Sequence, residues 1–442
     1  MKKIAVFFFL VFLVFPARGQ DSFEFLKNKD KLRFSFSFIN NLVLIPVKLN
    51  GVPLTFLLDT GVGQTIVFSV DESNNSQYKN VEKIRLKGFG SDYTALGLKS
   101  TDNVLEIKGM QSQSHLLYVI LGGEFNFSDH LGVPVNGIIG HSFFKNHLVE
   151  INYAKKRITL YKDTPKNTKR VFRKFTQLPL IIEKDKPYVM GNVTINNRSI
   201  PVKLLLDVGN SDSVWLFEND KIKIPTKNFD DYLGKGFSGD AYGKRAKIEA
   251  FQLDNFTFKR PIVAFPDSTT IQYLKFVPGR MGSVGGEILK RFSVMIDYKN
   301  SNLYLKPNGM FANPFLYNKS GIEVIHAGMK FVNIQVNQKA LLMKTASQFD
   351  SDKPGELTDF KYKFELKPIF KVASVRVNSP AAQSGIKEGD VIVSINKHNA
   401  DSYSYQELLA ILKSDEEKWI TMEVIRKGEI LTFKFKLVSI LE

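Results

Sequence analysis

Two aspartates in similar surroundings are the residues of this 442-residue chain best suited to catalysis. Asp59 follows the apolar run Phe56–Leu58 and Asp207 follows Leu204–Leu206, and a glycine comes two positions after each aspartate. Two carboxyl groups within hydrogen-bonding distance cannot both ionise easily, so such a pair shares one proton. One member can then take a proton from water while the other polarises a carbonyl group. A single Asp-Xaa-Gly is only a turn signal, so this interpretation depends on the surrounding sequence.

The segments after the two aspartates repeat in the same order. Lys87–Asp92 and Lys235–Asp240 both place their first glycine 29 residues beyond the aspartate. The turns Gly137–Gly140 and Gly282–Gly285 come next, and each leads after 13 residues to a tyrosine. Three signals in one order and at nearly one spacing indicate an internal repeat of about 150 residues.

Each repeat resembles a lobe of the pepsin and retropepsin superfamily of aspartic proteases, over roughly residues 32–306. The resemblance implies a mainly β fold in which two retropepsin-like β lobes form a pseudo-symmetric, pepsin-like cleft. In that family an Asp-Thr-Gly loop supplies each catalytic carboxylate, an apolar-Gly turn supports the loop, and a hairpin flap covers the substrate. A flap tyrosine either donates to the substrate or packs within its hairpin. The residues carried over are Asp59 and Asp207 as catalytic groups, Thr60, Gly61, Gly209, Asn210, Ser211, Gly140 and Gly285 as loop support, and Gly88, Gly90, Tyr93 and Tyr242 as flap candidates.

The two Asp-Xaa-Gly copies differ at their middle residue. In the family this residue is Thr or Ser, whose hydroxyl reaches across to the opposite lobe; Thr60 can do so and Val208 cannot. The loss of one hydrogen bond costs about 0.5–1.5 kcal/mol, which would loosen the geometry without abolishing catalysis. Asn210 and Ser211 either donate near Asp207 or cap its turn. The alternative to an active peptidase is a catalytically silent peptide-binding protein that retains the two-lobed cleft.

The first residues predict export. Met1–Lys3 is basic, Ile4–Pro16 is an apolar run shorter than the roughly 20 residues of a membrane span, and Ala17–Gly19 offers the small residues of a cleavage site. We therefore expect residues 1–19 to be a cleaved signal peptide. The mature chain, without a transmembrane span, would be periplasmic or extracellular in a bacterium.

The composition narrows the chemistry further. The chain has no Cys, which excludes a thiol nucleophile, disulfides and cysteine-zinc sites. Its six His residues form no pair with metal-ligand spacing, so we expect neither a metal nor a cofactor. The net charge of +17 comes from scattered lysines without a nucleic-acid motif. It therefore indicates a solvated basic surface, and we expect no nucleic acid partner.

The last third resembles a bacterial PDZ domain. Val375–Asn396 contains a Ser-Pro-Ala-Ala helix start, a closing Gly and a Gly-Asp turn into an apolar strand, and Ser404–Leu412 carries the apolar stripe of a second helix. PDZ domains bind extended peptides at a sheet edge, often with capture of a C-terminal carboxylate. The candidate carboxylate loop is Ser320–Val324, which would make Gln338–Pro368 an insertion. The candidate peptide-binding residues are Gly321, Ile322, Leu408 and Leu412.

The expected parts are a signal peptide (1–19), two protease-like lobes (20–162 and 171–308) and a PDZ domain (320–440, core 369–440). The predicted function is an exported aspartic endopeptidase that hydrolyses peptide bonds by a water activated between Asp59 and Asp207. The PDZ domain would recruit peptide or protein substrates. A third hypothesis keeps catalysis but lets dimerisation control access to the cleft, and the oligomeric state stays open.

Overall fold

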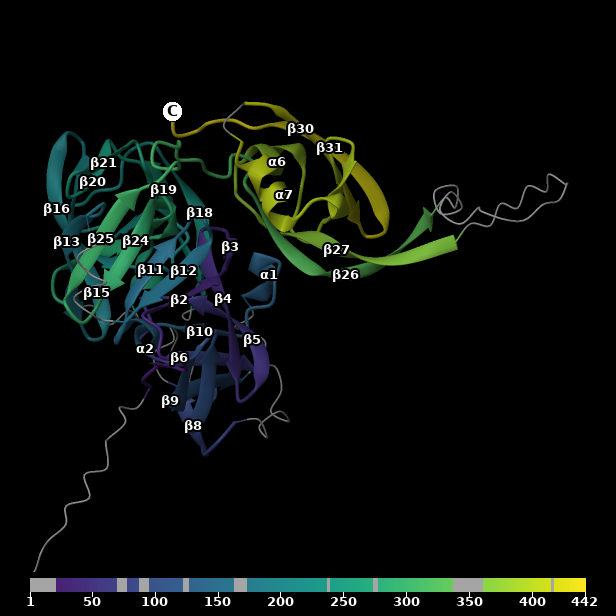
Figure 1. Cartoon of the computed structure of the whole chain (residues 1–442). Coiled ribbons are helices and arrows are strands. Elements are labelled where there is room, and N and C mark those ends of the chain that lie inside the picture. Colours follow the sequence, from purple (N-terminus) through teal and green to yellow (C-terminus); the bar gives the residue numbers. More distant parts are fainter. Residues whose placement is uncertain are drawn as a thin grey trace, which may run out of the picture.

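The computed structural model describes residues 21–69, 78–86, 95–121, 127–162, 173–236, 239–272, 277–336, 361–414 and 417–442. The fold is mainly β, with 55% strand and 9% helix. Figure 1 shows the first half of the chain in purple and blue, the second half in teal and green, and a C-terminal domain in yellow-green. The expected signal peptide and the flap candidates Gly88, Gly90 and Tyr93 lie outside the described residues.

The first half is built on one large sheet, here called the first sheet. Strand β8 pairs with both β4 and β9, which closes six of its strands into a barrel. Its strands, in spatial order, are β1 (Glu24–Phe25), β9 (Met110–Leu121), β6 (Thr65–Ser69), β10 (Gly137–Ile139), β5 (Val52–Leu58), β4 (Leu42–Leu49), β8 (Ala95–Ile107) and β7 (Val81–Leu86), with β3 (Ser37–Ile39) beside β4.

The second half forms a separate sheet, the second sheet. Here β18 and β19 make a long hairpin at one end, and β20 and β21 make a shorter one at the other. Its strands, in spatial order, are β18 (Asn228–Gly236), β19 (Gly239–Lys247), β22 (Ile262–Pro266), β17 (Val214–Leu216), β23 (Arg280–Val284), β16 (Arg198–Leu206), β15 (Lys186–Ile195), β20 (Ala250–Leu253) and β21 (Phe256–Lys259), with β14 (Ile181–Glu183) beside β15.

The two sheets share an arrangement around their centres. The order β9-β6-β10-β5-β4 in the first matches β22-β17-β23-β16-β15 in the second. The directions agree as well: β10 runs parallel to β5 as β23 does to β16, and β6 runs parallel to β9 as β17 does to β22. The repeat found in the sequence therefore corresponds to a repeated topology.

A third sheet, the shared sheet, joins the halves. At its centre β11 pairs antiparallel with β24, which sets Val149 opposite Ile296 and Ile151 opposite Val294. These residues belong to one hydrophobic core cluster that also contains Leu58 and Leu206. The strands, in order, are β13 (Thr176–Pro179), β25 (Asn302–Pro307), β24 (Phe292–Asp297), β11 (Leu148–Asn152), β12 (Arg157–Tyr161) and β2 (Lys31–Ser35).

Short helices follow the glycine turns of both halves. They are α2 (His141–Phe144) after Gly140 and α5 (Gly286–Leu289) after Gly285. Two others are α1 (Ser128–Leu131) and α4 (Ser268–Ile271). None of the helices within the described ranges is both long and apolar enough to cross a membrane.

The C-terminal domain has its own sheet and core. Ser379 caps the first helix, whose C-terminal Gly385 has φ 99°, and Ser404 with Glu407 forms a capping box on the second. The sheet contains β26 (Ile322–Val336), β27 (Lys361–Val375), β28 (Val391–Ile395), β30 (Trp419–Arg426) and β31 (Glu429–Lys436), with β29 (His398–Asn399) beside β28; the helices are α6 (Pro380–Ser384), α7 (Tyr405–Leu412) and the 3-10 helix Ala400–Ser402.

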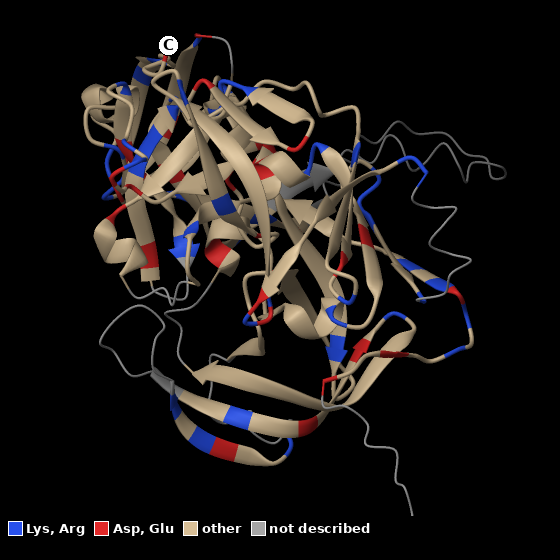
Figure 2. Cartoon of the chain, turned by 90° about the vertical axis from the view of Figure 1, so that its left-hand side faces the viewer, with Lys and Arg blue, Asp and Glu red and all other residues tan. Residues whose placement is uncertain are grey.

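Charged residues of both signs are distributed over the whole chain. Figure 2 shows Lys and Arg interspersed with Asp and Glu on strands and loops of the described part, with no single basic stretch.

Candidate functional site

The two Asp-Xaa-Gly loops leave their sheets at equivalent points. Asp59 follows the last residue of β5 and Asp207 the last residue of β16. The Asp59 N–H donates to the Ile139 carbonyl at 2.9 Å, and the Asp207 N–H donates to the Val284 carbonyl at the same distance. Because β10 and β23 hold the loops through these bonds, both loops begin from matching positions.

The shared sheet and core bring the two carboxyl groups into contact. A Cβ placed on Gly61 would lie 3.0 Å from Asp59 Oδ1 and 3.4 Å from Asp207 Oδ1, so both carboxyl groups lie against the same glycine. The Gly61 N–H also donates to Asp59 Oδ1 at 2.6 Å. A Cβ placed on Gly209 would lie 2.3 Å from Asp59 Cγ, so only glycine leaves room for this approach. The structure thus joins two residues that lie 148 positions apart in the sequence.

The electrostatics of this pair favour one retained proton. Burial and then the neighbouring Asp207 charge raise the pKa of the Asp59 carboxyl to about 8, against the opposing effects of the Gly61 amide and Lys186. Burial also raises the pKa of Asp207, although Arg280 and Lys186 act in the other direction. These shifts favour one retained proton shared between the two carboxyl groups.

Two cations beside the pair were not singled out from the sequence. Lys186 begins β15 and Arg280 begins β23, and both line the same cavity as the aspartates. Burial lowers the pKa of each, while the nearby carboxylates raise it. No local sequence signal marks them, because only the packing of the second sheet brings these strand ends to the carboxyl groups.

Thr60 links the two loops. Its hydroxyl donates to the Leu206 carbonyl at 2.5 Å and accepts the Val208 N–H at 3.0 Å. Both Thr60 and Val208 are fully buried. On the opposite side Val208 has no hydroxyl and packs in the shared core, so the side-chain hydrogen bonds run in one direction only.

Asn210 and Ser211 cap the loop after Asp207 within the described contacts. Asn210 Oδ1 accepts the Asp212 N–H at 2.9 Å, and its amide group donates to Ser283 Oγ at 3.1 Å. The Ser211 carbonyl accepts a bond from the side chain of Asn41 in the first half, at 2.9 Å. These contacts hold the loop in place and tie it to the other half.

The supporting glycines Gly140 and Gly285 lie in close contact with the backbone of the Asp59 and Asp207 loops. A Cβ on Gly140 would lie 1.9 Å from the Val62 carbonyl oxygen and 2.5 Å from that of Asp59. A Cβ on Gly285 would lie 2.5 Å from the carbonyl oxygen of Asp212. Both positions therefore require glycine because another backbone approaches closely.

One cavity of about 2000 Å³ extends from the two aspartates to the C-terminal domain. Tyr242 lines it from β19, and its ring lies 5.6 Å from that of Tyr232 on the paired strand. Tyr242 is 51% exposed, so it contacts the cavity and also packs within its hairpin. From the C-terminal domain the lining includes Gly321, Arg376 and Gln406.

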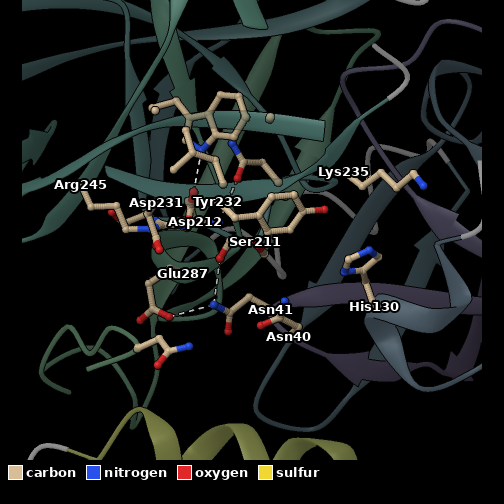
Figure 3. Close-up of a pocket in the computed structure, with 18 of the residues that line it drawn as sticks. Asn40, Asn41, His130, Ser211, Asp212, Asp231, Tyr232, Lys235, Arg245 and Glu287 are labelled. Carbon is tan, nitrogen blue, oxygen red and sulfur yellow. Dashed lines mark hydrogen bonds and ion pairs between the residues drawn. The ribbon is translucent and has the colours of Figure 1, made fainter. Parts of the chain in front are cut away.

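A charged network forms one wall of this cavity (Figure 3). Arg245 lies between two carboxylates, with distances of 2.7 Å to both Asp212 and Asp231. Arg376 of the C-terminal domain approaches Asp231 at 3.3 Å. Nearby, Asn41 donates to Glu287 at 2.8 Å. The network connects the C-terminal domain to the loop that carries Asp207, and sequence reasoning missed it.

The four peptide-binding candidates occupy different environments. Ile322, Leu408 and Leu412 are fully buried in the core of the C-terminal domain. Gly321 has φ 80° and lines the cavity, and a Cβ there would lie 2.3 Å from Ser379 Cβ. The strand that Gly321 precedes pairs with β27, where Ile322 lies opposite Val375, so the candidate loop does join this sheet.

The comparison with known families concerns the C-terminal domain. Residues 371–426 match the PDZ domain family. The domain is therefore a PDZ domain, which confirms the prediction made for this part and suggests peptide binding. The chain matched no curated protein. In the part that the structure describes, no group of three or more His, Asp or Glu residues lies together so as to hold a metal ion.

Proposed function

We propose that this chain is an aspartic endopeptidase with two pepsin-like lobes and a peptide-binding PDZ domain. The observation that carries the proposal is the buried, adjacent pair of Asp59 and Asp207 that lines the large cavity. The repeated strand order and the one-way Thr60 bridge support it further. The proposed setting is outside the cytoplasm of a bacterium, from the expected signal peptide.

The proposed reaction uses the single proton of the pair. A water between the carboxyls gives a proton to ionised Asp207 as its oxygen attacks the scissile carbonyl carbon, and Asp59 gives its proton to the carbonyl oxygen. The tetrahedral intermediate then collapses: the C–N bond breaks, Asp207 returns its proton to the leaving nitrogen, and the gem-diol proton returns to Asp59. The products are a carboxylic acid and an amine, and the pair regains its starting state.

The second candidate is a silent peptide-binding protein with the same cleft. Val208 is the observation that favours it, since the loop of Asp207 lacks the hydroxyl that Thr60 supplies on the other side. In that case the PDZ domain and the cavity would both hold peptides without cleavage.

Cleavage of a mixed peptide library separates the two candidates. We expect wild type to cut library peptides at acid to neutral pH, and Asp59→Asn and Asp207→Asn to lose this activity while retaining the fold. Asp254→Asn, at an exposed turn, is the control. The peptidase proposal fails if every peptide that wild type cleaves is also cleaved by the two variants, or if wild type cleaves none.

A further inference from the structure

The PDZ sheet has an edge strand that another part of the chain covers. β26 lies at the end of the sheet, next to β27. PDZ domains accept an extended peptide as an added strand at such an edge. Here α1 of the first half packs against β26, and Figure 1 shows it between the first sheet and the PDZ domain. His130 Nδ1 of α1 lies 3.9 Å from Glu323 Oε1 of β26.

The start of α7 is covered by the same segment. Gly132 ends α1 with φ 68°, and its N–H donates to the Ser128 carbonyl at 2.8 Å. A Cβ on Gly132 would lie 3.0 Å from Tyr405 Cβ and 3.2 Å from Tyr405 Cγ. The Tyr405 hydroxyl in turn donates to the Val324 carbonyl of β26 at 2.7 Å. The first residue of α7 is thus in contact with Gly132, and the Val324 carbonyl of β26 already accepts a hydrogen bond from that same residue.

The loop before β26 is also internally bonded. Asn318 Oδ1 accepts the N–H groups of Ser320 and Gly321, at 3.1 and 3.2 Å. The Ile322 N–H donates to Ser320 Oγ at 3.1 Å. In peptide capture such backbone N–H groups hold a terminal carboxylate. Because the side chains of this loop already accept these bonds, an incoming carboxylate would have to displace them.

The PDZ domain is held over the cavity by both halves. Gln406 donates to the Phe38 carbonyl at 3.3 Å, and Lys413 Nζ donates to Asn40 Oδ1 at 3.4 Å. On the other side Arg376 meets Asp231 at 3.3 Å. Figure 3 shows the yellow ribbon of the PDZ domain beside Asn40 and Asn41 at the cavity. Movement of the PDZ domain away from the first half would therefore widen the cavity that contains the aspartates.

We propose that the partner of the PDZ edge is the chain's own segment Ser128–Gly132, so that the PDZ domain closes the cavity until an extended peptide displaces this segment. Peptide binding at β26 and closure of the cavity are then mutually exclusive. The inference rests on the proposed function only in treating the cavity as a substrate cleft.

Peptide capture by matched glycine variants tests the exclusion. All proteins carry Asp59→Asn so that no probe is cut, and the probe is a phage-displayed library of random C-terminal heptapeptides. Gly132→Asn introduces a side chain against Tyr405. The control is Gly51→Asn, at another left-handed glycine, where an added Cβ would have no heavy atom within 4 Å. We expect Gly132→Asn to retain about tenfold more phage than the parent, because more molecules are open. Equal retention by the two Asn variants would overturn the proposal.

A reversible lock tests the same point in one folded molecule. The chain has no Cys, so Gly132→Cys with Tyr405→Cys introduces a single pair. Their Cβ positions lie 3.0 Å apart and must separate by about 0.5–0.8 Å to reach disulfide geometry. We expect diamide oxidation to abolish phage retention and dithiothreitol to restore it, with no redox effect in the Gly51→Cys and Tyr405→Cys control. Retention that is equal in both redox states would contradict the inference.

Cleavage assays keep the two proposals separate. With Asp59 restored, Gly132→Asn should cut library peptides faster than wild type if the cavity is a substrate cleft. Should Gly132→Asn gain phage retention while neither protein cuts any peptide, the displacement stands and the peptidase proposal falls. Should wild type cut peptides while Gly132→Asn and its parent retain equal amounts of phage, the peptidase proposal stands and the displacement falls.

Discussion

The loops around Asp59 and Asp207 are built alike in the backbone and differently in the side chains. Both begin with an N–H bond to the adjacent parallel strand, at 2.9 Å in each case. Only the first loop has a hydroxyl at its middle position, and that hydroxyl serves both the Leu206 carbonyl and the Val208 N–H. One threonine can therefore join two loops, while the valine contributes apolar packing.

The charges around the two aspartates differ as well. Asp207 has Arg280 and Lys186 as the main influences that oppose the effect of burial, whereas burial and the Asp207 charge together act on Asp59. The two loops therefore place their carboxyl groups in different electrostatic surroundings. A repeated backbone can thus surround two equivalent carboxyl groups with different neighbouring charges.

Replacing either aspartate should have the largest effect. On the proposed mechanism, Asp59→Asn and Asp207→Asn should each lower kcat/KM for library peptides by about 10³-fold or more, because that mechanism loses its general acid or its general base. Mass-spectrometric detection of products gives the measurement. A variant within a few-fold of wild type would show that its carboxyl group is dispensable.

Adding one methyl group at Gly209 should come next. Gly209→Ala places a Cβ 2.3 Å from Asp59 Cγ, so the carboxyl must move, and a displacement of about 1 Å costs on the order of 10²-fold in rate. Gly61→Ala should cost less, since its nearest contact is 3.0 Å away. Gly309→Ala, with nothing within 4 Å, is the control for kcat/KM. Equal rates at all three positions would contradict the close approach.

The proton retained by the aspartate pair should set an alkaline limit to activity. Activity should fall about tenfold per pH unit above a midpoint near 8, where the pKa of Asp59 lies. The stabilising contribution of this proton is complete below the unfolded pKa of about 4 and is lost as the pH rises through about 8. Lys186→Gln should move the midpoint upward, because Lys186 lowers that pKa. A pH–rate profile with its midpoint unmoved would count against this role of Lys186.

Removal of the Thr60 hydroxyl should destabilise the protein by about 1–3 kcal/mol, because two buried backbone groups lose their partner. Chemical denaturation of Thr60→Val gives the free energy of unfolding. Thr257→Val, at an exposed strand position, serves as the control and should change little. A Thr60→Val protein as stable as this control would show that the Thr60 hydroxyl bonds do not stabilise the fold.

Restoring a hydroxyl to the second loop should have the smallest effect. Val208→Thr should raise the cleavage rate about two- to tenfold, the change that corresponds to one added hydrogen bond of about 0.5–1.5 kcal/mol. Steady-state kinetics on a single cut peptide measure it. A lower unfolding temperature without any gain in rate would mean that the new hydroxyl finds no partner in the core.

Much of the local structure followed from the sequence. The Ser-Pro-Ala-Ala segment and Gly385 predicted the helix that forms over Pro380–Ser384, and Ser404 predicted the start of the next one. These features depend on caps, turns and side-chain periodicity within a few residues, which a sequence displays directly.

The sequence by itself determined the repeat, the two Asp-Xaa-Gly loops, the Thr60 to Val208 difference and the PDZ domain. Only the tertiary structure decided that β11 and β24 pair and so bring the carboxyl groups together. It also decided that Lys186 and Arg280 lie beside them and that α1 covers the PDZ edge. The reason is physical: these arrangements come from burial of apolar surface between segments far apart in the chain, and that packing leaves no short-range pattern.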